Sequence, residues 1–273
     1  MIPAGRSFYK MSGSGNDFVV VDARHEPRGE LGQTEVIQRI CARGTGVGAD
    51  GIVFLEPSSA AAIRLTYLNA DGSRADLCGN ATLCTTRLSV ELGVGAPDGF
   101  DIETDSGIVA ARIRAGQPEI DLQPVHGVQE EAHGIHRELG ELRIGFALVG
   151  VPHLVILCDD VSTIDVVGRG RPLRHHPLMT HGANVNFVSP SLDGRWRMRT
   201  YERGVEAETL ACGSGSVASA ILLTAWGEAS GTVELETSSG RVLSVRLNRD
   251  GDMWIPSLSG EGRVVYQAQL SEV

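Results

Sequence analysis

The feature that most constrains the fold is an internal repeat. Each copy begins with a Cys-Gly pair, passes through a helix-like stretch and reaches an E-T-x-S-G segment. The cysteines, Cys78 and Cys212, are separated by 212 − 78 = 134 residues, and the glutamates, Glu103 and Glu236, by 236 − 103 = 133. Two landmarks that agree so closely predict a duplicated domain, in which each copy places one cysteine at the start of one helix.

Short β-like runs dominate the rest of the chain, and Gly, Asp, Asn and Pro turns separate them. Helix-like patterns are fewer, over 33–43, 80–92 and 214–227. Many strands with few helices favour an α+β fold with largely antiparallel sheets. We therefore expect two pseudo-symmetric domains, residues 1–124 and 125–273, each an antiparallel or mixed sheet wrapped around a central helix. The polar segment 117–141 is the expected crossing, and the active site is expected in the cleft between the domains. The β-like runs are 17–22, 51–55, 63–69, 100–103, 108–114, 142–148, 153–157, 183–188, 195–201, 232–237 and 241–247.

Charge and composition exclude several classes of protein. The 24 basic and 34 acidic side chains give a formal charge of −10 without a basic stripe, which argues against a nucleic-acid partner. The N-terminal segment has no apolar signal-peptide core, and the apolar runs are too short or too interrupted to span a membrane. Five cysteines without paired close spacings fit a reducing compartment. We expect a cytoplasmic protein with a small-molecule partner.

Cofactor motifs are also missing from the sequence. Lys10 is the only lysine, and it lies in an apparent strand, so a pyridoxal Schiff base is a poor interpretation. The glycines at 46, 48 and 51 satisfy a dinucleotide pattern, but a helix precedes them and a strand follows, which is the wrong order. The histidines at 133, 136, 175, 176 and 181 lack a completing ligand pattern. We expect neither a cofactor nor a metal.

The repeated cysteines point to proton transfer at carbon. The positive end of a helix favours a thiolate, and its free N–H groups form a cradle for a carboxylate. Two thiols facing one cleft can remove a proton from one face of a carbon and return one on the other. The alternative is that a cysteine is simply a small buried apolar residue. That alternative is favoured for Cys41, Cys84 and Cys158, whereas the repeat favours function for Cys78 and Cys212.

Several segments together resemble the diaminopimelate epimerase family. The resemblance implies a cofactor-independent isomerase that interconverts LL- and meso-diaminopimelate for lysine and peptidoglycan synthesis. It also implies a homodimer, and a last strand near residues 264–270 that crosses back to the first domain. The segments occur in the family's order: Lys10–Phe18, Gly46–Gly51, Asn69–Ser73, Cys78–Asn80, Pro152–His153, Asn184–Phe187, Tyr201–Gly204 and Glu208–Gly215.

The resemblance also implies roles for individual residues. Cys78 and Cys212 would be the acid/base pair, with His153 and Glu202 tuning their proton affinities. Helix-start N–H groups at Gly79, Asn80, Gly213 and Ser214 would bind the α-carboxylate. The distal end of the substrate would be held by Asn16, Asn69, Asn184 and Arg203, because a guanidinium grips a carboxylate and amide oxygens accept from an ammonium. Glu202 is also expected to bind the substrate. Turn asparagines and a core histidine are the alternatives for Asn16, Asn69, Asn184 and His153.

Some positions depart from the family pattern. Val151 stands where many members have an asparagine that contacts substrate, and the stretch from Arg203 to Cys212 is one residue longer than usual. These departures leave the thiols intact and bear on the substrate. A racemase of another amino acid, such as histidine, and a thiol redox switch therefore stay open as alternatives.

Overall fold

The structure of the protein is a computed structural model in which residues 5–271 are described. The chain divides into two compact units: unit 1 comprises the described residues up to Ile120 and those from Ser259 onward, and unit 2 comprises Asp121–Leu258. The boundary expected from the sequence, between residues 124 and 125, stays a prediction. Within the described residues, no helix is long and apolar enough to cross a membrane.

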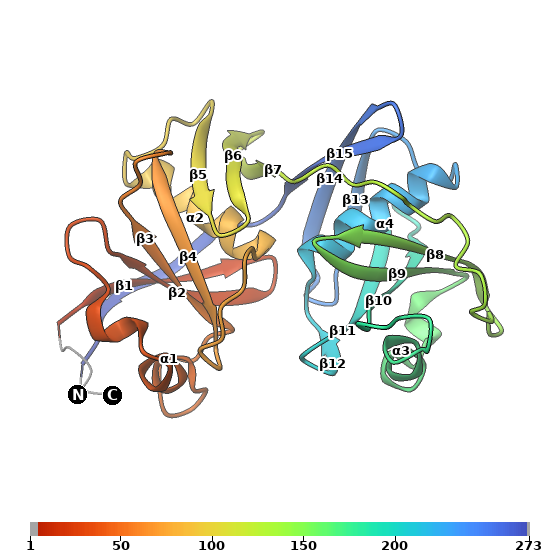
Figure 1. Ribbon diagram of the computed structural model, residues 1–273, viewed down its shortest axis with the longest axis horizontal. Helices are drawn as coiled ribbons and strands as arrows, with labels where there is room; N and C mark the ends of the chain where they lie inside the picture. The colour runs from red at the N-terminus through yellow and green to blue at the C-terminus, as the bar shows by residue number, and fades with distance from the viewer. Residues whose placement is uncertain (1–4, 272–273) are drawn as a thin grey trace. The chain divides into compact units, whose positions relative to one another are not determined.

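Unit 1 is a mixed sheet that surrounds one helix (Figure 1). The helix α2 (Gly79–Glu91) contacts strands from both ends of this sheet. The strands follow the order β16-β1-β2-β3-β4-β5-β6-β7. They are β1 (Ser7–Gly13), β2 (Asn16–Asp22), β3 (Gly51–Glu56), β4 (Ile63–Asn69), β5 (Phe100–Thr104), β6 (Gly107–Arg114), β7 (Gln117–Asp121) and β16 (Arg263–Gln269), with α1 (Thr34–Cys41) and a 3-10 helix (Gly29–Gly32) between β2 and β3.

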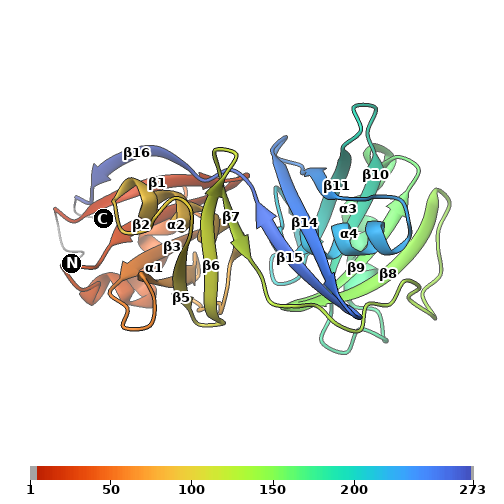
Figure 2. The ribbon, with the colours of Figure 1, turned by 90° about the horizontal axis from the view of Figure 1, so that it is seen from above.

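The strand β16 joins the first strand of unit 1 from the other end of the chain. It pairs antiparallel with β1, from Ser7 opposite Gln269 to Ser12 opposite Arg263. Figure 2 shows the two strands side by side. All of unit 2 lies between them in the sequence, so the sheet of unit 1 is assembled from both ends of the chain.

Unit 2 repeats this arrangement around the helix α4 (Gly213–Ala225). Its strand order is β8-β9-β10-β11-β13-β14-β15, with β12 paired to β11. The elements are β8 (Glu141–Val149), β9 (Val151–Cys158), a 3-10 helix (Val161–Thr163), α3 (Val166–Arg174), β10 (Asn184–Pro190), β11 (Trp196–Glu202), β12 (Ala207–Thr209), β13 (Thr232–Glu236), β14 (Val242–Asp250) and β15 (Met253–Ser259).

The two units have the same pattern of strand pairing. From β1 to β6 the pairs alternate antiparallel, parallel, antiparallel, parallel and antiparallel. The series β8-β9-β10-β11-β13-β14 alternates in the same way. Helices also occupy matching places, with α1 and α3 before the third strand and α2 and α4 before the fifth. The predicted α+β fold with two similar copies is confirmed.

The central helices are built from small residues because strands surround them. Nearly every residue of α4 from Gly213 to Leu223 is buried, which is typical of a helix inside a core. Buried hydroxyls bond back along the helix: Thr82 Oγ1 donates to Cys78 O at 2.9 Å, and Ser216 Oγ donates to Cys212 O at 2.9 Å. Small side chains let the sheet pack closely around each helix.

The helix α3 was not expected from the sequence. It contains Gly168, Gly170 and Pro172, which are all poor helix formers. Its start is stabilised by Asp165, whose carboxylate accepts from Gly168 N at 2.9 Å. A Cβ at Gly170 would lie 2.5 Å from Tyr201 Cβ, so glycine is needed for α3 to pack on β11. Tertiary packing therefore overrides helix propensity here.

Candidate active site

Cys78 and Cys212 both occupy the N-cap position of a central helix, as the repeat predicts. Their backbones are extended, with φ and ψ of −124° and 111° at Cys78 and −136° and 109° at Cys212. Cys212 Sγ accepts a hydrogen bond from Gly215 N at 3.3 Å and lies 3.6 Å from Ser214 Oγ. Cys78 is half-buried, whereas Cys212 is 6% exposed. A sulfur beside free helix N–H groups is in the environment that favours a thiolate.

The other three cysteines are buried free thiols. Burial raises the pKa of Cys41 to about 11 and that of Cys158 to about 12. It also raises the pKa of Cys84, which has no exposed surface. A thiol that stays protonated is a poor nucleophile and a poor base, so these cysteines act as apolar packing residues.

The start of each central helix offers backbone donors. Thr82 N and Ser216 N are bonded back to the carbonyls of Cys78 and Cys212, both at 2.9 Å. The N–H groups of the first two residues of each helix have no acceptor in their own helix. The residues at these positions are Gly79 and Asn80 in unit 1 and Gly213 and Ser214 in unit 2. Both helix starts can therefore hold a carboxylate.

A chain of side-chain hydrogen bonds fixes Asn80 in unit 1. Asn16 Nδ2 donates to Asp50 Oδ2 at 2.9 Å, because a carboxylate only accepts. Asn16 Oδ1 then accepts from Asn80 Nδ2 at 2.6 Å. Asn80 Oδ1 is buried and has no partner among the described residues. The start of α2 thus presents an amide acceptor beside its N–H donors, a combination suited to an ammonium and a carboxylate on one carbon.

Asn69 lies at the end of β4, near the same Asp50. Ala70 N donates to Asp50 O at 3.0 Å, which ties the end of β4 to this region. The Asn69 amide bonds locally: Nδ2 donates to Ser73 Oγ at 3.0 Å, and Oδ1 accepts from the Tyr67 hydroxyl at 3.0 Å. The structure therefore places Asn69 with Asn16 and Asn80 at one end of the unit 1 sheet, but holds its amide in a turn.

The predicted residues of unit 2 gather where β9, β10 and β11 meet. His153 on β9 pairs in register with Asn184 on β10. Asn184 Oδ1 accepts from Arg203 N at 2.8 Å, and the Arg203 guanidinium donates to His181 O at 3.1 Å. Glu202 Oε2, at the end of β11, accepts from Thr209 Oγ1 at 2.7 Å. One end of the sheet therefore carries a guanidinium, a carboxylate and an imidazole.

His153 is a neutral imidazole. Its side chain has no exposed surface, and burial, followed by the charge of Arg203, lowers its pKa to about 3. Nδ1 lies 3.2 Å from Asn186 Nδ2, while Nε2 has no partner among the described residues. Sequence reasoning missed Asn186 and Thr200, whose Oγ1 donates to Asn186 Oδ1 at 3.0 Å. The one available signal was the alternation of Asn184 and Asn186, which puts both side chains on one face of β10.

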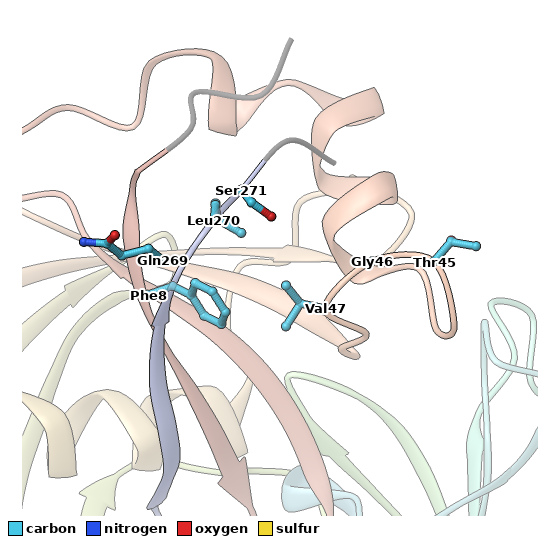
Figure 3. A pocket seen from close by; sticks show the side chains of 7 residues that line it. All are labelled: Phe8, Thr45, Gly46, Val47, Gln269, Leu270 and Ser271. Atoms are coloured by element: carbon cyan, nitrogen blue, oxygen red, sulfur yellow. The ribbon is translucent and has the colours of Figure 1, made fainter.

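A separate cavity of about 270 Å³ lies in unit 1, away from the predicted residues. It is lined by Phe8, residues 45–47 and residues 269–271, and Figure 3 shows the Phe8 ring and Val47 at its wall. None of the lining residues is charged at neutral pH. Among residues 5–271, no three His, Cys, Asp or Glu side chains come together as candidate metal ligands.

Comparison with protein families gives one match over most of the chain. The model described as diaminopimelate epimerase matches residues 8–125 and 145–265. The diaminopimelate epimerase of Gemmatimonas aurantiaca is 47% identical over 275 residues, which cover 97% of this chain and 99% of that protein. The diaminopimelate epimerase of Aquifex aeolicus is 36% identical over 279 residues, covering 97% and 98%.

Solved structures with lower sequence identity share the fold. A PhzF-family phenazine biosynthesis protein from Bacillus anthracis has a TM-score of 0.72 at 18% identity, covering 98% of this chain and 99% of that one. A hydroxyproline epimerase from Agrobacterium vitis, with bound trans-4-hydroxy-L-proline, has a TM-score of 0.69 at 19% identity, covering 97% and 92%. Both similarities concern the fold alone.

Proposed function

Because the chain belongs to the diaminopimelate epimerase family, we propose that Cys78 and Cys212 catalyse its reaction, the epimerisation of LL-2,6-diaminopimelate to the meso form. The observation that carries this assignment is the shared N-cap position of the two cysteines in two copies of one fold. The protein is an isomerase, and meso-diaminopimelate serves lysine and peptidoglycan synthesis.

The reaction needs one base and one acid on opposite faces of the α-carbon. One cysteine, as a thiolate, takes the α-proton, so that the C–H bond breaks and an S–H bond forms. The other cysteine, as a thiol, gives its proton to the opposite face, so that its S–H bond breaks and a new C–H bond forms. The centre is inverted and no electrons leave the substrate. Proton transfer by positioned groups of this kind typically contributes about 10²–10⁴-fold to the rate.

The helix starts bind the reacting amino-acid head in this proposal. The N–H groups of Gly79, Asn80, Gly213 and Ser214 hold the α-carboxylate, where they also stabilise the negative charge that develops when the α-proton leaves. The unpartnered Asn80 Oδ1 accepts from the α-ammonium. These donors are backbone groups of helices that are packed on all sides, so they are already in position before the substrate binds.

The distal amino-acid head is held by Asn16, Asn69, Asn184, Glu202 and Arg203. The Arg203 guanidinium binds the distal carboxylate, and Glu202 with the amide oxygens accepts from the distal ammonium. Glu202 and His153 also act on the proton affinity of the thiols. The reaction uses no pyridoxal phosphate, nicotinamide or metal, and we place it in the cytoplasm in a homodimer.

Val151 makes the choice of substrate a separate question. Val151 is the first residue of β9, directly after Gly150, and a valine side chain cannot form a hydrogen bond to a second amino-acid head. A substrate without that head would leave the polar groups around Arg203 unpaired, and such sites discriminate by about 10⁴–10⁵-fold. Diaminopimelate is therefore favoured over a single-headed amino acid such as histidine, and a thiol redox switch has no use for these groups.

Exchange of the α-proton with solvent tests the proposal. In D₂O, NMR should show rapid loss of the α-proton signal from LL- and meso-diaminopimelate, and little from L-histidine. Cys78→Ala and Cys212→Ala should each abolish epimerisation, while Cys158→Ala, a matched change at a buried thiol, should retain it. Faster exchange on histidine would overturn the substrate, and turnover in Cys212→Ala would overturn the two-thiol mechanism.

A further inference from the structure

The duplicated fold provides an internal comparison for the residues around His153. His153 pairs with Asn184 where Phe18 pairs with Gly51, because β9-β10 and β2-β3 are equivalent parallel ladders. Likewise, Asn186 pairs with Thr200 where Val53 pairs with Tyr67. The positions of His153, Asn186 and Thr200 in unit 2 therefore correspond to Phe18, Val53 and Tyr67 in unit 1.

In unit 1 these positions form ordinary core. Phe18 and Val53 have no exposed surface, and the rings of Phe18 and Tyr67 pack edge to face with centroids 5.9 Å apart. The fold is therefore built without an imidazole or an amide at these positions; the polar group there is the Tyr67 hydroxyl, which donates to Asn69 Oδ1. Burying an imidazole and an amide costs free energy unless each is hydrogen-bonded. Their presence in unit 2 alone indicates a role in chemistry rather than in folding.

Hydrogen bonds determine which way the Asn186 amide faces. A backbone carbonyl only accepts, so the atom 3.1 Å from Leu154 O is the donor Nδ2. Oδ1 then accepts from Thr200 Oγ1 at 3.0 Å. The second hydrogen of Nδ2 faces His153 Nδ1, 3.2 Å away. Nδ1 must therefore be the acceptor, and the single proton of the neutral ring lies on Nε2.

The Asn186 amide also lies against the start of α4. A Cβ at Gly215 would lie 2.3 Å from Asn186 Oδ1 and 3.1 Å from Cys212 Sγ, so only glycine leaves room between them. The equivalent position in unit 1, counted from the repeated cysteines, is Ala81, and the residue equivalent to Asn186 there is Val53, which carries no amide. Asn186 therefore connects His153 to the segment that carries Cys212.

We propose that Asn186 is a positioning residue that holds His153 as its Nε2–H tautomer, so that His153 serves the reaction as a neutral hydrogen-bond donor. Nδ1 is occupied by the amide and Nε2 carries the proton, so the ring has no lone pair with which to deprotonate a thiol. His153 then acts on the proton affinity of a thiol only as a donor, and removal of the thiol proton depends on the helix starts and on Glu202. The catalytic role of the tautomer rests on the proposed function, but the tautomer itself can be measured without any substrate.

Nitrogen NMR of the unliganded, ¹⁵N-histidine-labelled protein reads the tautomer directly. The His153 signals are those absent from His153→Gln. We expect Nε2 to be protonated and Nδ1 unprotonated, with no change between about pH 5 and 8, where an ordinary histidine titrates. A proton on Nδ1, or titration in this range, would overturn the inference and leave the two-thiol mechanism untouched.

Variants separate the role of Asn186 from simple packing. Asn186→Asp replaces the donor with an acceptor, so it should move the proton to Nδ1 or charge the ring. Its kcat should fall by roughly 10–10³-fold, since a wrong imidazole tautomer in a serine protease triad costs about 10⁴-fold. Ser189→Ala is the matched control, because Ser189 is a buried residue of the same strand that accepts from Val161 N. It should leave both the tautomer and kcat unchanged.

A second variant covers the case in which Asn186→Asp does not fold. Thr200→Val keeps the shape of the side chain but removes the hydroxyl that donates to Asn186 Oδ1. The amide then loses one of the bonds that fix it, and His153 should show a mixture of tautomers with a smaller loss of kcat. Wild-type tautomer and wild-type kcat in Thr200→Val and in a folded Asn186→Asp would refute the proposal.

Discussion

Thr209 Oγ1 donates a 2.7 Å hydrogen bond to Glu202 Oε2 across the short ladder between β11 and β12. The hydroxyl lies three residues before Cys212 in the chain, and the carboxylate ends the strand before it. A hydrogen bond to a charged group is worth about 1.5–3 kcal/mol. Thr209 therefore helps to fix the direction of a carboxylate that the proposed mechanism uses.

Replacing Thr209 with valine should lower kcat by about 10-fold while the fold is retained. The change keeps the branched shape and removes only the donor, and about 1.4 kcal/mol of lost orientation corresponds to a factor of ten. Thr209→Ser keeps the hydroxyl and should remain close to wild type. Steady-state kinetics on LL-diaminopimelate measures both variants, and equal losses in the two would contradict the role of the hydroxyl.

Alkylation should distinguish the cysteines by their ionisation. The thiolate is the form that reacts, and at pH 8 a thiol of pKa about 11, such as Cys41, is ionised in only about one molecule per thousand. Raising the pH increases this ionised fraction, but Cys158, with a pKa of about 12, stays protonated to a higher pH than Cys41. Brief treatment with iodoacetamide followed by mass spectrometry should label Cys78 first. Early labelling of Cys84 or Cys158 in the folded protein would contradict this order.

His153 should make the protein less stable in acid. The folded ring has a pKa of about 3, against 6.5 for an ordinary histidine, so unfolding takes up a proton between these values. The free energy of unfolding should therefore fall by up to about 1.4 kcal/mol per pH unit as the pH decreases from 6.5 towards 3. His153→Gln lacks this contribution. Urea denaturation at several pH values measures both proteins, and parallel pH dependences would count against a neutral buried His153.

Gly215→Ala should impair both folding and turnover. The added Cβ would meet Asn186 Oδ1 at 2.3 Å and Cys212 Sγ at 3.1 Å, and overpacking of this kind costs about 1–3 kcal/mol. Because both atoms belong to the proposed site, kcat should fall as well. Gly99→Ala is the matched control, since its Cβ meets nothing within 4 Å and its φ is not positive. Thermal unfolding and steady-state kinetics measure both variants. Equal losses in Gly215→Ala and Gly99→Ala would contradict a role for the close contact at position 215.

Much of the architecture can be predicted from the sequence because helices and strands are marked by short, local sequence patterns. The Cys-Gly pairs predicted both central helices, and alternating apolar residues predicted strands such as β4 at 63–69. The strand β7, at 117–121, lies inside the segment expected to be an irregular crossing. The sequence Gln-Pro-Glu-Ile-Asp carries a proline and charges, and it becomes a strand through pairing with segments such as β6.

The missed members of the candidate site have a different cause. Asn186 and Thr200 acquire their roles from the register between β9, β10 and β11, which is a contact between distant segments. The sequence showed Asn186 inside a recognisable motif, but nothing in the motif says that its amide faces His153. The alternation along β10 predicts the face of the strand on which Asn186 lies. Its hydrogen-bond partner is known only once the neighbouring strands of the sheet are placed.

The position of β16 has a consequence for how the protein is made on the ribosome. Synthesis runs from the N-terminus, so every residue of unit 2 has been added before β16 emerges to pair with β1. Until then, β1 presents an open strand edge of the kind that invites pairing with other nascent chains. Unit 2 can complete its sheet first. The sheet of unit 1 therefore begins to be translated first and is completed last. Until β16 pairs with it, the unpaired edge of β1 is a place where a molecular chaperone can prevent aggregation.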